Sequence, residues 1–470
     1  MTGFRFPFPA MIVGLTLTGS AVMVTNAQTP PMPDIRTPDI LQSYIYGYAP
    51  VAMEATRAIE TAVPDALVSP GRAPVNQFGR SESLATPNSR LVIRPNADML
   101  YTSAWLDLAG QPLILHVPDT TGRYYLIPLY DAYSNEFASV GSRTTGNSEG
   151  NYAIIGPHWR GTLPNGLSGV LRAPTNTVWA LGRTLVRGAA DLPAAVAVTT
   201  QYQLVPLSDY AGFIATGVYT PPTGVPVVAP NPNFVGFPVT ASPGFSMPEY
   251  FSVLGEYFLR NLPPPQELRQ AVPLALYGLA NQNLLTPTTV SQADADFITE
   301  LQSTAANKNG WSVNLNGGTY GTNYLLRAAV ARFGLGANIP ADAVYASMAK
   351  AADGGPLVGT NAYVMHFEPG QTPPVNGFWS LTVYDQAGVL VPNPINRYDV
   401  GSETGLVPNA DGSIDIFLQN APPTATQANW LPTPAAPFNL TLRFFWPAKS
   451  VLDGTYEIPP VTQVVAAGLQ

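Results

Sequence analysis

The hydrophobic and polar positions along the chain predict strands near both ends and helices between them. Residues 100–108 alternate with a period of two, so that Tyr101 and Asp107 share one face, as in a half-buried strand. Two more strand-like runs, 113–117 and 123–130, are separated by turns rich in Pro, Gly and Asp. Further short strands are expected to about residue 205, at a spacing that favours an antiparallel sandwich.

Helical spacing precedes these strands and returns in the middle of the chain. Thr37 is expected to cap a helix that has Pro38 in its first turn and extends to about residue 61. Pro50 is expected to kink this helix or to divide it in two. A Pro- and Gly-rich connection then leads to a capping box at 246–249, which starts a helix that ends near residue 261. Further helices are predicted at 266–279, 291–306, 323–333 and 341–350, and strands return from residue 357.

Length and charge exclude some classes of protein. A chain of 470 residues is too long for one hydrophobic core, so two or three domains are expected. Charged residues make up 11% of the chain, less than half of the roughly 25% typical of soluble domains. With a net charge of −8, the chain is poorly suited to nucleic acids, because neutralising phosphates requires clustered Lys and Arg.

Residues that ligate metals or form covalent intermediates are scarce. The chain has no cysteine, which excludes disulfides, thiolate nucleophiles and Cys-ligated metals. Its three histidines, His116, His158 and His366, lie far apart in the sequence. His-Glu-x-x-His and phosphate-loop motifs are absent. We therefore expect no metal and no cofactor, and whether the protein is an enzyme stays open.

Residues 1–27 have the pattern of a secretory signal peptide. Arg5 provides the positive charge, residues 6–24 are mostly apolar, and Ala27 supplies a small residue before the expected cleavage site. The alternative is an uncleaved membrane anchor. We expect export to the periplasm or the outside of the cell.

Two sets of motifs resemble families of unknown function. The run R-P-N-A-D-M-L-Y at 94–101, followed by G-R-Y-Y and Y-D-A-Y, resembles domain of unknown function 1254. The runs P-P-V-N-G-F-W-S-L-T-V-Y-D at 373–385 and N-P-I-N-R-Y at 393–398, with the closing L-R-F-F-W-P, resemble domain of unknown function 1214. The resemblance implies a mainly β fold with an immunoglobulin-like β-sandwich, a helical middle domain and a C-terminal jelly-roll β-sandwich.

These patterns together divide the chain into five parts. They are the signal peptide at 1–27, a linker and N-terminal helix at 28–62, the immunoglobulin-like sandwich at 63–206, a connector with the helical subdomain at 207–350, and the jelly-roll sandwich at 351–470.

One internal similarity crosses this division. Residues 124–131 align without gaps with 378–385, and both runs start with two aromatic residues and end in Tyr-Asp. The two runs are either related to one another or have converged on a common strand pattern, and the sequence favours neither explanation of their similarity.

Polar side chains crowd the start of the first predicted strand. Pro95 is expected to hold Arg94 in an extended conformation, while Asn96 and Asp98 favour a turn. Together with the phenol of Tyr101, this set can bind an anionic or hydroxyl-rich ligand. The alternative, which we favour from the sequence, is that an Arg94–Asp98 pair only stabilises the turn.

Other polar groups join this candidate site only if the fold brings them together. Asp98 and Asp131 would suit acid–base hydrolysis if they lay close to one another. A polar and aromatic group in the C-terminal region would suit sugar rings, although a structural role in a jelly-roll core is the alternative. The candidate ligand-binding residues are Arg94, Asn96, Asp98, Tyr101, Arg123, Tyr124, Asp131, Trp379, Asn393, Arg397 and Tyr398.

Two classes of function remain. The first is an exported envelope or extracellular protein that binds a small polar or carbohydrate-like ligand without catalysis. The second is a secreted, metal-independent hydrolase or lyase that uses Asp, Tyr and Arg in an interdomain cleft. The absence of cysteine and the scarcity of histidine favour the first. A charge-poor surface with many aromatic residues further predicts a homo-oligomer of two to four chains.

Overall fold

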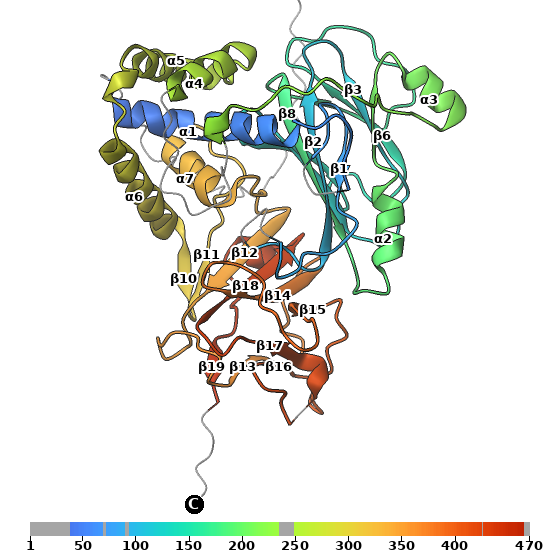
Figure 1. Ribbon diagram of the computed structural model, residues 1–470. Coiled ribbons are helices and arrows are strands. Elements are labelled where there is room, and N and C mark those ends of the chain that lie inside the picture. The colour runs from blue at the N-terminus through green and yellow to red at the C-terminus, as the bar shows by residue number, and fades with distance from the viewer. Residues whose placement is uncertain (1–37, 69–71, 90–93, 235–248, 425, 465–470) are drawn as a thin grey trace, which may run out of the picture. The chain divides into compact units, whose positions relative to one another are not determined.

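A computed structural model of the chain has two β-sandwiches and a group of helices (Figure 1). It describes residues 38–68, 72–89, 94–234, 249–424 and 426–464, and all of these belong to one unit, Thr37–Gln470. This part of the chain is mixed α/β, with four largely antiparallel sheets and eight α-helices. The predicted signal peptide and most of the predicted linker lie outside the described residues. The immunoglobulin-like and jelly-roll architectures are not confirmed.

The first sandwich consists of two sheets that enclose one hydrophobic core. One sheet has the order β1 (Gly79–Arg80), β2 (Met99–Asp107), β8 (Thr177–Leu185), β4 (Tyr125–Tyr130), β5 (Glu136–Gly141). The other has the order β7 (Gly169–Arg172), β6 (Gly150–Ile155), β3 (Leu113–Val117), β9 (Gln203–Pro206). Alternate residues of both sheets, such as Leu106, Ile127 and Leu115, pack between them.

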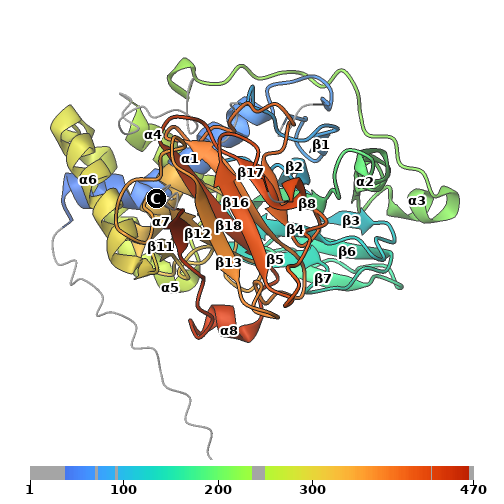
Figure 2. The same cartoon turned by 90° about the horizontal axis from the view of Figure 1, so that it is seen from below.

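The second sandwich is built in the same way. One sheet has the order β10 (Ala306–Lys308), β11 (Trp311–Val313), β12 (Ala343–Met348), β18 (Phe438–Phe445), β14 (Trp379–Asp385), β15 (Asp399–Gly401). The other has the order β17 (Trp430–Pro432), β16 (Ile414–Gln419), β13 (Tyr363–Phe367), β19 (Val461–Gln463). In Figure 2, strands β8, β4 and β5 lie between the β7–β6–β3 sheet and the second sandwich.

Apart from the extra edge strand β10, the two sandwiches have the same strand order, and their registers correspond residue by residue. Met99 faces Leu185 across β2 and β8, just as Ala343 faces Phe445 across β12 and β18. Leu126 opposite Arg183 likewise corresponds to Ser380 opposite Arg443. Each sandwich also has one parallel strand pair, β6 with β7 and β16 with β17. One topology is therefore used twice, and the similar runs 124–131 and 378–385 are the equivalent strands β4 and β14.

The helices fall into a main group and a few isolated turns. Helix α1 (Ile40–Glu60) packs against α4 (Tyr250–Arg260), α5 (Pro265–Ala280), α6 (Pro287–Thr304) and α7 (Tyr324–Gly334), as Figure 1 shows. The remaining helices are α2 (Leu192–Thr199), α3 (Tyr210–Thr216), α8 (Lys449–Leu452) and the 3-10 turns Pro232–Phe234, Gln282–Leu284 and Gln427–Asn429. None of the helices in the described ranges is long and apolar enough to cross a membrane.

Some predicted element boundaries were wrong. The N-cap of α1 is Asp39, whose carboxylate accepts a hydrogen bond from the Gln42 amide, and the helix continues through Pro50 instead of dividing. Residues 341–350 were predicted to be helical, but they contain β12, which is paired along its whole length with β18. Tertiary pairing therefore outweighs the local helix preference there. Strand β5 and helix α3 were not predicted.

Candidate functional site

The face of the β12–β18–β14–β15 sheet that is turned toward the first sandwich is polar. Its alternate residues Val344, Leu442 and Leu381 point the other way, into the core of the second sandwich. We call the opposite set the polar face. It consists of Tyr345 and Ser347 on β12, Asn439, Thr441 and Arg443 on β18, Ser380, Thr382 and Tyr384 on β14, and Asp399 on β15.

The architecture itself does not require this polarity. By strand register, Ser380, Thr382 and Thr441 correspond to Leu126, Pro128 and Leu181 of the first sandwich. The hydroxyls of Ser380 and Thr441 are buried and, within the described part of the chain, have no hydrogen-bond partner. Burying an unpaired hydroxyl costs free energy that an apolar residue would avoid. Such groups indicate a site that something else satisfies.

Arg443 is the centre of the polar face. Its guanidinium donates to the Thr382 hydroxyl at 2.8 Å, to the Tyr384 hydroxyl at 2.6 Å and to the Arg94 carbonyl at 2.9 Å. The side chain is fully buried, its Nε is unpartnered, and it forms no ion pair within the described ranges. By contrast, the buried Arg327 of the helical group is paired with Glu267 at 3.0 Å. An arginine buried without a direct ion pair is costly, and the nearby Asp98 carboxyl group is the one that opposes its charge.

The equivalent arginine of the first sandwich, Arg183, makes a related contact. It donates to the Gly336 carbonyl at 3.1 Å, and Tyr130 donates to the same carbonyl at 2.8 Å. Tyr384, which corresponds to Tyr130, donates to the Pro95 carbonyl at 2.6 Å. Each sandwich thus contacts the loop that precedes the first long strand of the other. These reciprocal contacts position Arg94 at the edge of the polar face.

Arg94 adopts a conformation that is unusual for its residue type. Its φ is 54°, in the left-handed region, and not extended as Pro95 predicted. Its amide donates to the Gly388 carbonyl at 2.8 Å, and its guanidinium donates to the Ser347 hydroxyl at 2.9 Å. A left-handed non-glycine residue costs about 1–2 kcal/mol. Local strain of this kind is common where a side chain has a binding role.

A pocket of about 670 Å³ opens beside the polar face. Arg94, Ser347 and Asn439 line it, and Lys350 adds a second cation. The other polar lining residues are Gln302, Asn307 and Ser312. Its described lining contains no carboxylate, although the whole chain has a net charge of −8. Two cations among amides and hydroxyls suit an anionic or hydroxyl-rich ligand.

The corresponding region of the first sandwich is closed. Trp179, the equivalent of Asn439, donates to the Ser103 hydroxyl at 2.8 Å and stacks on Trp105 with ring centroids 5.2 Å apart. Trp105 in turn donates to Glu60, the last residue of α1, at 2.6 Å. Indole rings and α1 therefore occupy the space that is open in the second sandwich.

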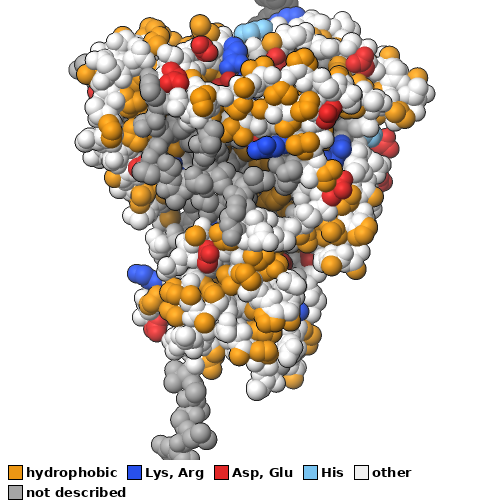
Figure 3. Space-filling view, in the orientation of Figure 1, with side chains coloured by type: hydrophobic (Ala, Val, Ile, Leu, Met, Phe, Trp, Pro, Cys, Tyr) orange, Lys and Arg blue, Asp and Glu red, His pale blue; other side chains and the backbone are white. Residues whose placement is uncertain are grey.

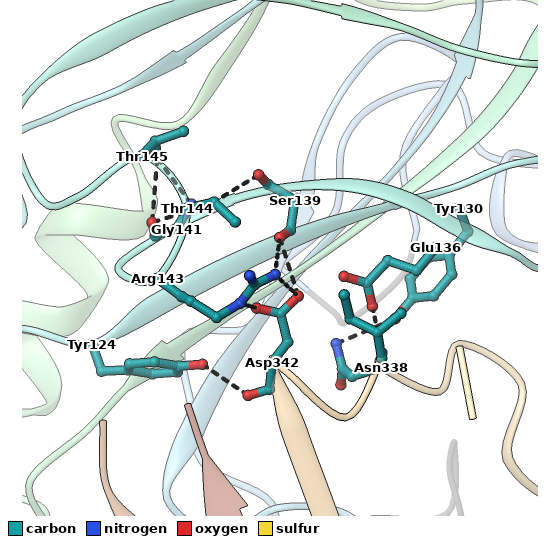
Figure 4. A network of polar contacts seen from close by, with 11 residues as sticks. Tyr124, Tyr130, Glu136, Ser139, Gly141, Arg143, Thr144, Thr145, Asn338 and Asp342 are labelled. Carbon is teal, nitrogen blue, oxygen red and sulfur yellow. Dashed lines mark hydrogen bonds and ion pairs between the residues drawn. The ribbon is translucent and has the colours of Figure 1, made fainter. Parts of the chain in front are cut away.

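A polar network also joins the two sandwiches on the side of strand β5 (Figure 4). Arg143 is paired with Asp342 through contacts of 2.5 and 2.9 Å, and the Ser139 hydroxyl donates to the same carboxylate at 3.1 Å. Glu136 accepts from the Ile339 amide at 2.9 Å. This network is largely satisfied by the protein itself.

The structure brings some of the predicted residues together. Arg94, Asp98 and Tyr101 lie at or beside the polar face, and Asn96 is buried next to them. Arg94 is not paired with Asp98, because its guanidinium is directed to Ser347. The preferred interpretation of this turn as an Arg94–Asp98 pair is therefore wrong.

The other predicted residues have structural contacts elsewhere. Arg123 is paired with Asp191 at 2.6 Å, and Tyr124 packs on Phe378 between the sandwiches. Asp131 accepts from the amides of Tyr133 and Asn135 in its own turn, so it does not form a pair with Asp98. Burial raises the pKa of Asp131 to about 6.

The side chains of the predicted C-terminal group do not converge on one face. Trp379 points into the core of the second sandwich, on the opposite side of β14 from the polar face. Arg397 donates to the carbonyls of Gln427, Ala428 and Trp430, and Asn393 is bonded to the backbone of Arg397. Tyr398 donates to Asn396 at 3.1 Å. These contacts hold loops together.

The sequence analysis missed four candidate site residues of the polar face: Arg443, Tyr384, Asp399 and Ser380. One signal was available for Arg443, because residues 438–445 place Asn, Thr and Arg at every second position between Leu and Phe. A charged residue in the middle of such a strand is rarely left unpaired without a reason. No described group of three or more His, Asp or Glu side chains is arranged to hold a metal ion.

Comparisons with known proteins identify two domain families of unknown function and two similar crystal structures. Residues 75–206 match the family described as "Protein of unknown function (DUF1254)", and residues 342–449 match "Protein of unknown function (DUF1214)". No curated protein matches the sequence. The crystal structure of the VPA0106 protein from Vibrio parahaemolyticus is similar with a TM-score of 0.64 and 23% identity, over 90% of this chain and 98% of that one. An uncharacterized protein from Burkholderia cenocepacia matches with a TM-score of 0.45 and 13% identity, over 92% and 90% of the two chains.

Proposed function

The chain belongs to the family that combines a DUF1254 domain with a DUF1214 domain, and since both are of unknown function we propose its function from the site alone. The protein binds a small anionic or hydroxyl-rich molecule beside the polar face. The observation that carries this proposal is the set of buried, unpartnered groups of Ser380, Thr441 and Arg443. The first sandwich has apolar residues at the two hydroxyl positions, so the fold alone does not explain them.

The pocket defines the chemistry of the ligand. Arg94 and Lys350 provide positive charge, and Asn307, Ser312 and Asn439 provide neutral hydrogen-bonding groups. A carboxylate or phosphate would be held by the cations, and hydroxyls by the amides. A carbohydrate-like acid has both kinds of group, and a pocket of this volume is in the range of small-molecule sites.

We also infer that the protein acts in the periplasm or outside the cell. The support is the pattern of residues 1–27, with Arg5 before an apolar run that ends at Ala27. Mass spectrometry of the exported protein should find Gln28 as its first residue. An exported protein that retains residues 1–27 would contradict the expected cleavage.

The alternative function, a metal-independent hydrolase or lyase, is favoured by one observation. Asp98 is a buried carboxyl group beside Arg443 and Tyr384, and such groups can act in acid–base catalysis. A panel of chromogenic glycosides and esters would test this class. Turnover by the wild type that is lost in Asp98→Asn would favour the enzyme over the binding protein.

A thermal-shift screen tests the binding proposal. Neutral sugars, uronic acids, sugar phosphates and dicarboxylic acids would each be added to the mature protein. A ligand present at a hundred times its Kd stabilises the folded state by about 2.7 kcal/mol, which raises the melting temperature measurably. We expect the anionic sugars to give the largest shifts and Arg94→Asn and Lys350→Ala to reduce them.

The matched control is Lys449→Ala. Lys449 lies on α8, outside the pocket, and is paired with Asp453 at 2.6 Å. This variant removes one positive charge, as Lys350→Ala does, but should keep the full thermal shift. Equal shifts in wild type, Arg94→Asn and Lys350→Ala would refute the proposed pocket.

A further inference from the structure

The two sandwiches differ in how they treat one equivalent pair of aspartates. In the first sandwich, Asp98 lies three residues before Tyr101, which is opposite Arg183 on the neighbouring strand. In the second sandwich, Asp342 lies three residues before Tyr345, which is opposite Arg443. Each aspartate points from one sandwich toward the other. Asp342 is neutralised by Arg143 and accepts from Ser139, and the Glu136 carboxyl group lies beside it. The environment of Asp98 is different.

Two substitutions between the repeats produce this difference. By strand register, Ser139 corresponds to Asp399 and Val140 to Val400. The following turn is Gly-Ser-Arg-Thr at 141–144 and Gly-Ser-Glu-Thr at 401–404, and in both turns the serine hydroxyl accepts from a strand amide at 3.1 Å. The arginine that neutralises Asp342 therefore corresponds to Glu403, which is directed away to Arg187 at 2.5 Å.

Asp98 consequently lies near the Asp399 carboxyl group and lacks an equivalent of Arg143, the arginine that neutralises Asp342. Asp98 is 7% exposed, and neither of its carboxyl oxygens has a hydrogen-bond partner of good geometry within the described ranges. The hydroxyls of Ser380 and Thr441, also buried and unpartnered, belong to the same polar face as Asp399. Arg443 compensates one negative charge, and a second one in this buried region would be costly.

We propose that Asp98 and Asp399 form an acid–base site at the inner end of the polar face, in which the two carboxyl groups together carry one proton and can exchange it with a hydroxyl-bearing ligand. Two neighbouring carboxylates that cannot both be ionised are a common arrangement for proton transfer. The shared proton leaves the net charge of Asp98, Asp399 and Arg443 at zero. The proposal rests on the contrast between the repeats and does not depend on the pocket at Arg94.

The surrounding charges agree with a shared proton. Burial raises the pKa of Asp98, while the nearby Ser380 hydroxyl and the positive charge of Arg443 act in the opposite direction and lower it. Burial and the charge of Asp98 raise the pKa of Asp399 to about 8, against the opposing effects of Arg443 and Arg397. Tyr384 and Tyr101 both face the Arg443 guanidinium. Burial raises the pKa of Tyr384, so its phenol stays neutral.

Proton counting tests the site without any ligand. The folded wild type and Asp399→Ser, which restores the residue of the first sandwich, would be titrated potentiometrically between about pH 9 and about pH 6. We expect the wild type to take up about one proton per chain more than the variant in this range. A double variant, Asp399→Ser with Glu403→Arg, would rebuild the arrangement around Asp342 and should lose the same proton.

Two controls keep the test decisive. Asp119→Ser removes an exposed carboxyl group whose pKa is lowered by its hydrogen bonds to Thr121, so it should take up as many protons as the wild type. If Asp399→Ser does not fold, the isosteric Asp98→Asn provides the same comparison. Equal proton uptake by the wild type and by the folded variants at Asp98 or Asp399 would overturn the proposal, whatever the outcome of the ligand screen.

Discussion

At the scale of single residues, a substitution of Arg94 distinguishes a structural role of this residue from a role in ligand binding. Its left-handed backbone costs about 1–2 kcal/mol, and its hydrogen bond to Ser347 returns about 1 kcal/mol. Asparagine tolerates the left-handed region better. Arg94→Asn should therefore change the free energy of unfolding by no more than about 1 kcal/mol, as measured by denaturant melts. A loss well above this value would return Arg94 to a structural role.

Glu60 is expected to make stability depend on pH. Burial raises its pKa to about 8, against the opposing effects of hydrogen bonds from Trp105 and Ser103. Since the pKa is raised in the folded state, the stabilisation is full below the pKa of the unfolded chain and is lost as the pH rises through about 8.

Glu60→Gln keeps an acceptor for Trp105 but has no proton to lose. The free energy of unfolding of Glu60→Gln, measured relative to the wild type by denaturant melts, should therefore be higher at about pH 9 than at about pH 5. Glu256→Gln, on the exposed side of α4, is the control. The same relative stability of Glu60→Gln at both pH values would contradict the assignment.

At the scale of elements, β12 shows where local pattern was misleading. Residues 343–348 are Ala-Val-Tyr-Ala-Ser-Met, which suits a helix as well as a strand. Only pairing with β18 decides the outcome, and it places Tyr345 and Ser347 on the polar face. The predicted helix over 341–350 would have separated these two residues from Arg443.

An apolar cluster fixes the contact between the equivalent strands of the two sandwiches. Phe445 is fully buried, and its ring stacks on Phe378 with centroids 4.5 Å apart. Tyr124 and Leu185 of the first sandwich belong to the same cluster. Phe445→Ala should lower the free energy of unfolding by about 3–5 kcal/mol, as measured by urea unfolding.

Phe333→Ala is the matched control, because Phe333 is 43% exposed at the end of α7. It should cost less than about 1 kcal/mol. Equal losses in the two variants would indicate that the apolar cluster does not join the sandwiches.

At the scale of the whole molecule, the surface predicts self-association. Charged side chains are few and scattered on the face shown in Figure 3. Leu259, Leu276 and Ile298, on α4, α5 and α6, are 81%, 61% and 46% exposed. We expect a homo-oligomer of two to four chains in light scattering. A particle mass near that of one chain, 49.9 kDa before processing, would contradict this expectation.

The sequence by itself determined most of the strands and helices, because each has a hydrophobic period that depends only on neighbouring residues. It also indicated Arg94, Asp98 and Tyr101 as candidate site residues and showed that 124–131 and 378–385 are similar. What it could not determine is which sheet face meets which. Ser347 lies 253 residues from Arg94, and Arg443 lies 349 residues from it, so only strand pairing and the packing of one repeat on the other bring them together. Alternation marks a polar face, but the tertiary structure alone decided that this face is buried, with a pocket beside it.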